Sequence, residues 1–309
     1  MGNNNLFGFK HLMIKFKRVP RKSDAFNIFI SILPILLLTL LILVYPLLSV
    51  FFHGFTKWTI SETRFIGLDN FRNLISNGSL VLLLKNNLIL LLTIPIQIFF
   101  SLIIAYLFYE EIWGWRIFRI LFYLPAVLST VVIGFLFRTI FALNGPLNEI
   151  IRFLHMDFLV VNWLGSRPTA FILVIAAFIW SQYGVAVLIF LAGMSSIEPS
   201  VLESAVVDGA NWWQRFFRIV LPMIVGTIEF YLVVLIIGFF TASFGFIYSI
   251  TAGGPGYGTT TLEYMIYIKA FKHNMLGQSS ALATILFVIV LVIVIIVLKV
   301  FRKMGEWQE

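Results

Sequence analysis

Residue types that carry out chemistry are few in this sequence of 309 residues, and they form no catalytic or metal-binding pattern. There is no cysteine, which excludes thiol nucleophiles, disulfides and zinc–thiolate sites. No two carboxylates are spaced as an acid–base pair, and no Gly-x-x-x-x-Gly-Lys-Ser/Thr segment is present to hold a phosphate. We therefore predict no catalytic residue, no metal site and no cofactor in this chain. The four histidines also lack metal-ligand spacing: His11, His53, His155 and His273.

The composition indicates that lipid is the solvent for most of the chain. Hydrophobic residues make up 60% of the sequence and charged residues only 12%, with a mean hydropathy of +0.99. Soluble domains carry roughly 25% charged residues. In lipid every backbone polar group must pair internally, so only helices or closed barrels span a membrane. The apolar runs are long and do not alternate with polar residues, which favours helices.

We predict an all-α membrane protein built as a bundle of six transmembrane helices. Residues 1–24 are predicted to form a basic cytoplasmic tail, either an amphipathic surface helix or a disordered segment, and residues 25–309 a single transmembrane domain. The net charge of +8 is explained by basic residues at the membrane borders. By apolar length the six spans are Phe26–Phe52, Leu80–Phe108, Ile117–Phe141, Thr169–Gly193, Leu221–Ser243 and Ala281–Val300.

The lysine and arginine residues between these spans predict the orientation of the chain. Cytoplasmic segments of membrane proteins carry an excess of basic residues close to the membrane. With the N-terminus inside, the short cytoplasmic segments are the most basic, so we expect both termini in the cytoplasm. The basic residues of that side are Lys10, Lys15, Lys17, Arg18, Arg21, Lys22, Arg116, Arg119, Arg215, Arg218, Lys299, Arg302 and Lys303.

One long polar segment, Ser195–Pro222, separates the fourth and fifth predicted spans. Pro199 suits the first turn of a helix, where its missing N–H costs nothing. Gly209 suits the left-handed residue that ends a helix, and Asn211 is placed to begin a second one. We predict two short helices at an angle, lying against the membrane with one face toward the cytoplasm. An ordinary amphipathic connector is the alternative.

This segment resembles the EAA loop of binding-protein-dependent ABC importer permeases. The resemblance lies in Glu203-Ser204-Ala205, in Gly209 six positions after the glutamate, and in Ile219, Leu221 and Pro222. Ser204 stands where the family usually has alanine and is small enough to keep the packing. The longer form, Asp208–Gln214, resembles the carbohydrate branch of maltose, glycerol-phosphate and multiple-sugar type. Further segments match that branch in the same order: Phe65–Phe71, Phe118–Ile120 with Leu124–Pro125, Asn148 with Trp163–Gly165, and Thr251–Pro255 with Thr259–Thr260.

The resemblance implies a type I importer permease, which is a transport subunit and not an enzyme. It implies two separate ATPase subunits that hold ATP and Mg, a second homologous permease (favouring a heterodimer) and an extracytoplasmic binding protein. The implied location is the plasma membrane of a bacterium or archaeon, and the implied cargo is a sugar or oligosaccharide that enters by alternating access. The residues that it assigns to coupling with the ATPase are Glu203, Ser204, Ala205, Asp208 and Gly209.

A sugar pathway requires aromatic faces for the rings and hydroxyl or amide groups for the sugar hydroxyls. The third, fourth and fifth spans offer both near mid-membrane, where the resemblance to maltose-type permeases also places substrate contacts. The alternative for each residue is helix–helix packing, which polar residues commonly mediate in bundles. The candidates are Thr130, Trp180, Gln182, Tyr183, Phe239, Phe240 and Ser243.

Other classes of function find less support in the sequence. An ion-driven carrier needs a relay of intramembrane ionisable groups, and the candidates for it are Glu229 and Arg138. Glu229 either serves transport or hydrogen-bonds a neighbouring helix. A membrane-embedded enzyme lacks a catalytic cluster, and the Asp208–Gln214 segment argues against a permease for amino acids, peptides or phosphonates.

Overall fold

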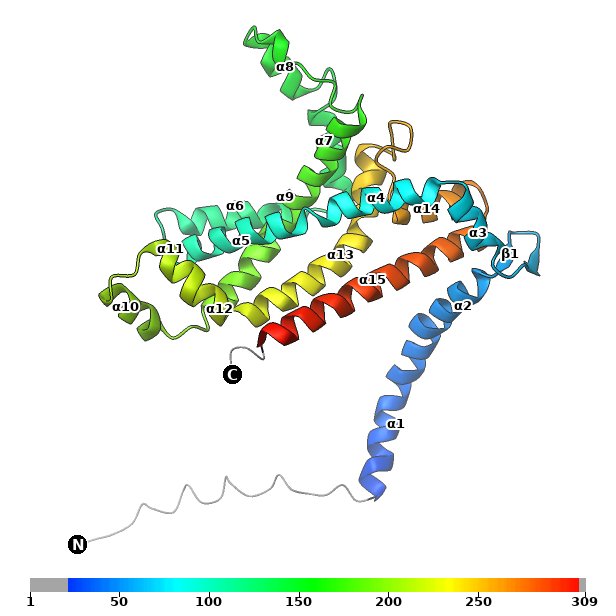
Figure 1. Cartoon of the computed structure of the whole chain (residues 1–309), viewed down its shortest axis with the longest axis horizontal. Helices are drawn as coiled ribbons and strands as arrows, with labels where there is room; N and C mark the ends of the chain where they lie inside the picture. Colours follow the sequence, from blue (N-terminus) through cyan, green and yellow to red (C-terminus); the bar gives the residue numbers. More distant parts are fainter. Residues whose placement is uncertain (1–21, 306–309) are drawn as a thin grey trace. The chain divides into compact units, whose positions relative to one another are not determined.

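The computed structural model describes residues 22–305, and the side chains of residues 26–302. The predicted basic tail lies outside the described residues, apart from its last residues, where α1 begins at Lys22. The chain divides into two units, Met1–Phe52 and His53–Glu309. The first unit holds a long apolar helix and the second holds all other elements (Figure 1).

The first unit contains α1 (Lys22–Thr39), the π-helical turn η1 (Leu40–Val44) and most of α2 (Tyr45–His53). Together they provide a helix, Phe26–His53, that is long and apolar enough to cross a membrane. The π-helical turn ends two residues before Pro46, whose ring nitrogen has no proton to donate to the preceding turn.

The second unit begins with a small β-hairpin that the sequence analysis did not predict. Strands β1 (Thr56–Trp58) and β2 (Thr63–Phe65) pair antiparallel, with Lys57 opposite Arg64. The amphipathic helix α3 (Asp69–Ser76) follows and buries Asn70 and Leu74. The Asn70 amide donates 2.9 and 2.8 Å hydrogen bonds to the carbonyls of Gly54 and Thr56, which fixes the hairpin to α3.

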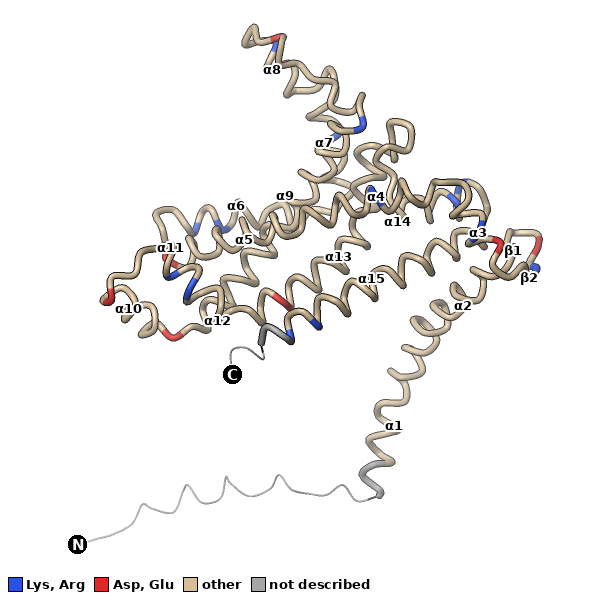
Figure 2. Tube along the Cα trace, viewed as in Figure 1, with Lys and Arg blue, Asp and Glu red and all other residues tan. Residues whose placement is uncertain are grey.

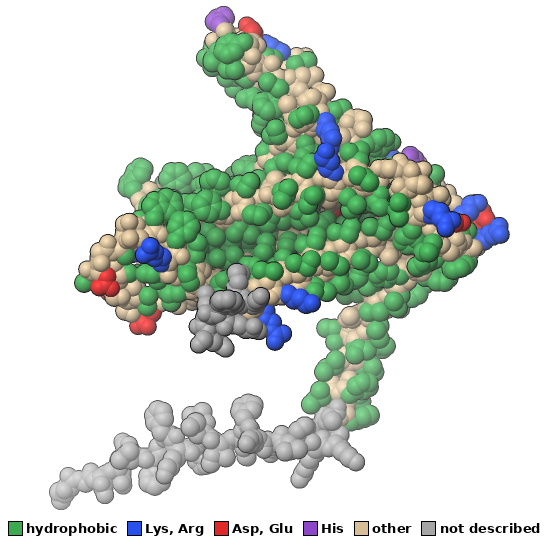
Figure 3. Space-filling view, viewed as in Figure 1, with side chains coloured by type: hydrophobic (Ala, Val, Ile, Leu, Met, Phe, Trp, Pro, Cys, Tyr) green, Lys and Arg blue, Asp and Glu red, His purple; other side chains and the backbone are tan. Residues whose placement is uncertain are grey.

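Four further candidate spans, made by five helices, form the bundle in the described part of the second unit. Helices α4 (Ser79–Leu91) and α5 (Ile94–Tyr109) together make one span, followed by α9 (Arg167–Met194), α13 (Val225–Ile250) and α15 (Leu276–Gly305). Helix α5 packs on α9, and α13 packs between α9 and α15 (Figure 1). Their interface is rich in aromatic rings such as Phe178 against Phe239, with centroids 5.3 Å apart. Hydrophobic side chains cover the flanks of the bundle (Figure 3), and charged residues gather mainly at helix ends and connections (Figure 2).

The predicted third span, Ile117–Phe141, is not one continuous helix. It consists of α6 (Trp115–Val127) and α7 (Thr130–Ile140), which meet at an angle of 102°. Pro125 lies in the last turn of α6, and the backbone of Leu128 and Ser129 is extended. The Ser129 Oγ accepts a hydrogen bond from the Val132 N–H and so caps a new helix. The described residues therefore contain five helices fit to span a membrane, or six if this bent pair is counted as one span.

Shorter elements connect the long helices. Between α7 and α9 lie α8 (Pro146–Phe153) and the 3₁₀ turn η2 (Asp157–Leu159). Between α9 and α13 lie α10 (Pro199–Val207), α11 (Trp212–Arg215), the π-helical turn η3 (Phe216–Val220) and α12 (Leu221–Met223). Before α15 lie α14 (Leu262–Tyr267) and the π-helical turn η4 (Ile268–Lys272).

Candidate functional site

The polar segment between α9 and α13 forms the two predicted short helices. Pro199 is in the first turn of α10, and Gly209 follows this helix with a φ of +79°. The N–H of Gly209 bonds the Val206 carbonyl and the N–H of Ala210 bonds the Ala205 carbonyl, which satisfies carbonyls that would otherwise be free at the helix end. These features confirm the helix boundaries expected from the sequence.

Helix α11 begins with a reciprocal cap. The Asn211 side chain accepts a 2.9 Å hydrogen bond from the Gln214 N–H, and the Gln214 side chain accepts a 2.8 Å bond from the Asn211 N–H. Such a capping box satisfies two backbone donors with side chains only three residues apart. The start of α11 at Asn211 is thus also confirmed.

Arg215 attaches this segment to the end of α5. Its Nη2 lies 2.6 Å from Glu110 Oε1, and its Nε donates a 3.3 Å hydrogen bond to the Tyr106 hydroxyl. These hydrogen bonds, the one to Tyr106 first, hold the pKa of Arg215 above its ordinary value. The Tyr106 ring is fully buried against Trp212 and Phe216, at centroid distances of 4.9 and 5.4 Å. The two-helix segment is therefore fixed to the bundle by an ion pair over an aromatic cluster.

The face of α10 that points away from the bundle is exposed and mixed in character. Among the predicted coupling residues Ala205 is buried, at 8% exposure, and forms the inner face of the helix. The others, Glu203, Ser204, Asp208 and Gly209, are exposed, as is Val207 at 87%. A groove of about 270 Å³ runs between α10 and the end of α5, lined by Tyr109, Glu110, Pro199, Leu202, Glu203, Val206 and Arg215. A second protein could bind here through both carboxylate and valine contacts.

The predicted pathway residues divide into exposed and buried groups. On α9, Trp180 is 40% exposed and its ring contacts Phe137 of α7, while Gln182 and Tyr183 are half-buried. Trp180 and Gln182 do not share a face, because residues two apart on a helix point in different directions. On α13 the side chains of Phe239, Phe240 and Ser243 are buried.

Thr130 is placed by close packing of α7 on α13. A Cβ added to Gly245 would lie 2.3 Å from the Thr130 Oγ1, so only glycine at this position admits the threonine. Thr130 and Ser243 are thus on two helices that pack on each other, while Trp180 lies on the α7 side of α9. The structure brings these three helices together but does not gather all seven candidates around one cavity. Their role in a pathway stays a prediction.

Residues 9–303 match the family model described as "Binding-protein-dependent transport system inner membrane component". The chain belongs to this family. The predicted identity as an ABC importer permease subunit, a transport component and not an enzyme, is thereby confirmed.

Individual relatives agree with this assignment. The multiple sugar-binding transport system permease protein MsmF of Streptococcus mutans is 31% identical over 271 residues, covering 87% of this chain and 92% of that protein. The sn-glycerol-3-phosphate transport system permease protein UgpA of Agrobacterium fabrum is 33% identical over 230 residues, covering 74% and 78%. A solved bacterial ABC transporter that imports the acidic polysaccharide alginate superposes with a TM-score of 0.78 at 26% identity, covering 91% and 96%. The predicted type I permease fold is confirmed.

The structure of the permease also shows a buried amide network that the sequence analysis missed. Asn86 of α4 is fully buried and donates 3.0 and 2.7 Å hydrogen bonds to the carbonyls of Gly258 and Thr260. Its neighbour Asn87 bonds Glu263 Oε1 at 2.9 Å and accepts from the Leu262 N–H. Two adjacent asparagines inside an apolar run were the available signal, since buried amides require partners. The network fixes the 251–261 turn to α4.

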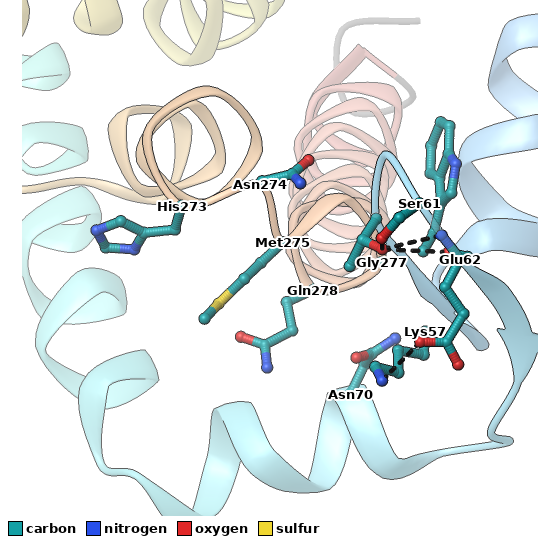
Figure 4. A pocket seen from close by; sticks show the side chains of 11 residues that line it. Lys57, Ser61, Glu62, Asn70, His273, Asn274, Met275, Gly277 and Gln278 are labelled. Carbon is teal, nitrogen blue, oxygen red and sulfur yellow. Dashed lines mark hydrogen bonds and ion pairs between the residues drawn. The ribbon is translucent and has the colours of Figure 1, made fainter.

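A polar pocket of about 480 Å³ lies between the β-hairpin, α3 and the start of α15 (Figure 4). The Lys57 ammonium donates a 2.8 Å hydrogen bond to Glu62 at its rim and so lowers the pKa of that carboxyl. Asn70 and Gln278 lie on the floor in this view, whereas His273 points away from the hairpin. Among the described residues no group of three His, Asp or Glu side chains is placed to hold a metal ion.

Proposed function

We propose that this permease moves a sugar or oligosaccharide into the cytoplasm as one subunit of an ATP-driven importer. The single observation that carries the coupling part of the proposal is the α10–α11 segment, which is capped at the junction between its two helices and joined to α5 through Arg215 and Glu110. The names of relatives support the cargo class, because they refer to multiple sugars, arabinooligosaccharides and alginate. The absence of a phosphate-binding segment in this sequence supports ATP hydrolysis on another chain.

In this proposal α10 is the element that receives the motion of the ATPase. Glu203, Ser204, Asp208 and Gly209 dock on a separate ATPase chain that holds ATP and Mg, while Ala205 packs toward the bundle. The Gly209 and Ala210 N–H groups close the C-terminal end of α10, and the reciprocal cap of Asn211 and Gln214 begins α11, so the junction between the two helices is held in one conformation. Displacement of α10 then reaches α5 through the Arg215–Glu110 ion pair and the Tyr106 cluster.

The remaining partners complete an alternating-access transporter. They are a second homologous permease in a heterodimer, two ATPase subunits and an extracytoplasmic binding protein. A second solved structure of the alginate transporter includes an alginate pentasaccharide-bound periplasmic protein, with a TM-score of 0.78 to this chain. Both termini face the cytoplasm, which places α10 on the same side as the ATPase. The substrate passes between α7, α9 and α13, where Thr130, Trp180, Gln182, Tyr183, Phe239, Phe240 and Ser243 are the candidate contacts.

The experiment is co-expression of this chain with its genomic neighbours, purification in mild detergent and reconstitution into vesicles. Copurifying subunits are identified, and sugar uptake per ATP hydrolysed is measured for the parent, Glu203→Ala and Glu198→Ala. Glu198 is the matched control because it is an exposed glutamate of the same segment, just before α10, whose side chain caps no helix end. We expect an ATPase and a second permease to copurify. Glu203→Ala should lower uptake per ATP at least about tenfold, equivalent to about 1.4 kcal/mol of coupling energy.

Three results would each contradict the proposal or a part of it. Recovery of the chain alone, with uptake driven by an ion gradient, would point to a carrier with Glu229 at its centre; this residue is half-buried in the first turns of α13. Equal uptake per ATP in the Glu203→Ala and Glu198→Ala variants would remove α10 from the coupling path. Uptake of an amino acid or peptide and not of a sugar would contradict the cargo class alone.

A further inference from the structure

An apolar groove with two basic residues at one end lies between α4 and α9. Its volume is about 360 Å³, and its walls are almost entirely apolar. The basic residues are Lys85 of α4 and Arg167, the first residue of α9. The apolar lining consists of Ile89, Pro168, Phe171, Ile172 and Ile175.

The order of these residues along the two helices is the same. Helices α4 and α9 each carry the basic residue first and the apolar lining afterwards. At 1.5 Å rise per residue, Ile89 lies about 6 Å beyond Lys85, and Ile175 about 12 Å beyond Arg167. A phospholipid has the same order, with a phosphate at the membrane surface and acyl chains below it. The groove therefore matches a lipid in both the position of its charge and the position of its apolar surface.

Neither basic residue has an acidic partner within the described part of the chain. The salt bridges found there join other residues, and the side chain of Lys85 is exposed. Lys85 lies inside the span Ser79–Tyr109, and Arg167 opens the span Arg167–Met194. Charged residues in such segments are expensive unless a counter-charge or water is near. An anionic group from the membrane would supply that counter-charge.

Arg167 is held in position by neutral groups that leave its charge uncompensated. Its Nε donates a 3.1 Å hydrogen bond to the Gly258 carbonyl, and its Nη2 a 2.9 Å bond to the Oδ1 of the fully buried Asn86. A Cβ on Gly258 would lie 2.9 Å from the Arg167 Cγ, so glycine is needed for this close approach. The arginine is thus fixed at the mouth of the groove before any ligand arrives, which lowers the entropy lost on binding.

We propose that this groove binds an anionic phospholipid, with the phosphate between Lys85 and Arg167 and an acyl chain along Ile89, Phe171 and Ile175. Two positive charges favour a headgroup with net negative charge over a zwitterionic one. A lipid bound here stabilises the fold, since it binds the folded groove and has no such site in the unfolded chain. Through Asn86 it also stabilises the attachment of the 251–261 turn to α4.

The test is a lipid titration of the purified complex in detergent, with melting temperature and native mass spectrometry as readouts. The probes are phosphatidylglycerol, phosphatidylcholine with the same acyl chains, and inorganic phosphate. The variants are Lys85→Gln, which removes one charge from an exposed side chain, and Lys272→Gln, which removes an exposed lysine of η4 outside the groove. A third variant, Ile172→Trp, fills the groove from a half-exposed position without altering charge.

We expect phosphatidylglycerol to raise the melting temperature more than phosphatidylcholine and to remain bound in the mass spectrum. Lys85→Gln should raise the half-maximal phosphatidylglycerol concentration about fivefold, as expected for one basic residue near a lipid headgroup. Ile172→Trp should weaken both lipids, and Lys272→Gln should leave the titration unchanged. None of these readouts uses ATP or transport, so they do not depend on the proposed cargo or coupling.

Four results would overturn the proposal. Equal stabilisation by the two lipids would show no preference for an anionic headgroup. An unchanged titration for Lys85→Gln would exclude the groove as the site. The same effect from inorganic phosphate would indicate a free-anion site without a role for the acyl chain. Lipid retained by the isolated chain but absent from the complex would mean that the second permease covers this groove.

Discussion

The α10–α11 segment and the 251–261 turn are both connections between long helices, but they are fixed to the bundle by different kinds of contact. Arg215 and Glu110 join the α10–α11 segment to α5 through a charged pair whose side chains are 18% and 26% exposed. The 251–261 turn is joined to α4 by the fully buried amide of Asn86. An ion pair near water contributes little to stability, whereas a buried polar group that loses its partner costs about 1–3 kcal/mol. We infer that the charged contact of the first connection can break while the bundle stays folded, whereas loss of the buried amide contact of the second destabilises the bundle.

The largest expected effect is from Asn86→Leu. The substitution removes the donor to the Gly258 and Thr260 carbonyls and the acceptor for Arg167. At least one buried carbonyl then has no partner, and we expect a loss of about 3 kcal/mol in the free energy of unfolding. This loss of stability is measured by thermal unfolding in detergent, with size-exclusion chromatography to monitor the folded fraction. The control is Asn73→Leu, at an exposed residue of α3. Equal losses in the free energy of unfolding for the two variants would contradict a stabilising role of the buried Asn86 amide.

The next effect is the pH dependence of stability at Glu263, which belongs to the same buried region. Burial raises the pKa of Glu263 above its ordinary 4.5, although the hydrogen bond from Asn87 opposes this. Below pH 4.5 the carboxyl is protonated in folded and unfolded chains alike. As the pH rises above that value the unfolded chain ionises first, so the folded state loses stability until its own raised pKa is passed.

Glu263→Gln should remove this loss. The melting temperature of the variant, relative to the parent, should therefore increase between pH 5 and pH 8. The comparison is made across that range in detergent with Glu198→Gln, at an exposed position, as the control. A constant difference between Glu263→Gln and the parent across the range would contradict a raised pKa for the buried Glu263 carboxyl.

Gly209→Ala tests the α10–α11 segment at its left-handed residue. Gly209 has a φ of +79° and open space where a Cβ would be, so the cost is conformational and amounts to about 1 kcal/mol. We expect α10 to lose its fixed end and uptake per ATP to fall, with little change in the melting temperature of the bundle. Gly226→Ala is the matched control, because Gly226 lies in α13 with equally open space and ordinary backbone angles. Gly209→Asn should be milder than Gly209→Ala, since asparagine tolerates left-handed angles.

A region can be predicted from the sequence when its contacting residues are close together in the chain, and not when they are far apart. The boundaries of α10 and α11 depend on Pro199, Gly209 and Asn211, whose partners are within five residues, and all three were predictable. The network of Asn86 joins residues 172 and 174 positions apart, and no local pattern indicates such a pairing. The β-hairpin and the choice of its partner α3 depend likewise on tertiary packing.

The bend in the third span and the faces of α9 show a second limit. Pro125 lies in the last turn of α6 and Ser129 caps the start of α7, but proline is common inside membrane helices and by itself predicts no 102° bend. The separation of Trp180 from Gln182, in contrast, follows from helix geometry alone and could have been predicted from their spacing. Apolar length indicated where the chain crosses the membrane, but not which side chains line a pathway.

Glu110→Gln should have the smallest effect on stability. It tests most directly whether the α10–α11 segment and the 251–261 turn are attached to the bundle in different ways. Glutamine keeps the size of the side chain and an oxygen for Arg215 Nη2 but removes the charge. Since the pair is partly exposed, its charge contributes about 1 kcal/mol or less to stability, and we expect a correspondingly small change in melting temperature. The relative loss in uptake per ATP should be larger than the relative loss in stability, because the contact joins the moving segment to α5.

The exchange Glu110→Arg with Arg215→Glu should restore part of the uptake per ATP that either single substitution loses. The opposite result would be a Glu110→Gln variant with a melting temperature as low as that of Asn86→Leu and with normal uptake per ATP. The ion pair would then stabilise the bundle without transmitting motion. Motion would have to reach the bundle through the Trp212–Tyr106 contact or another route.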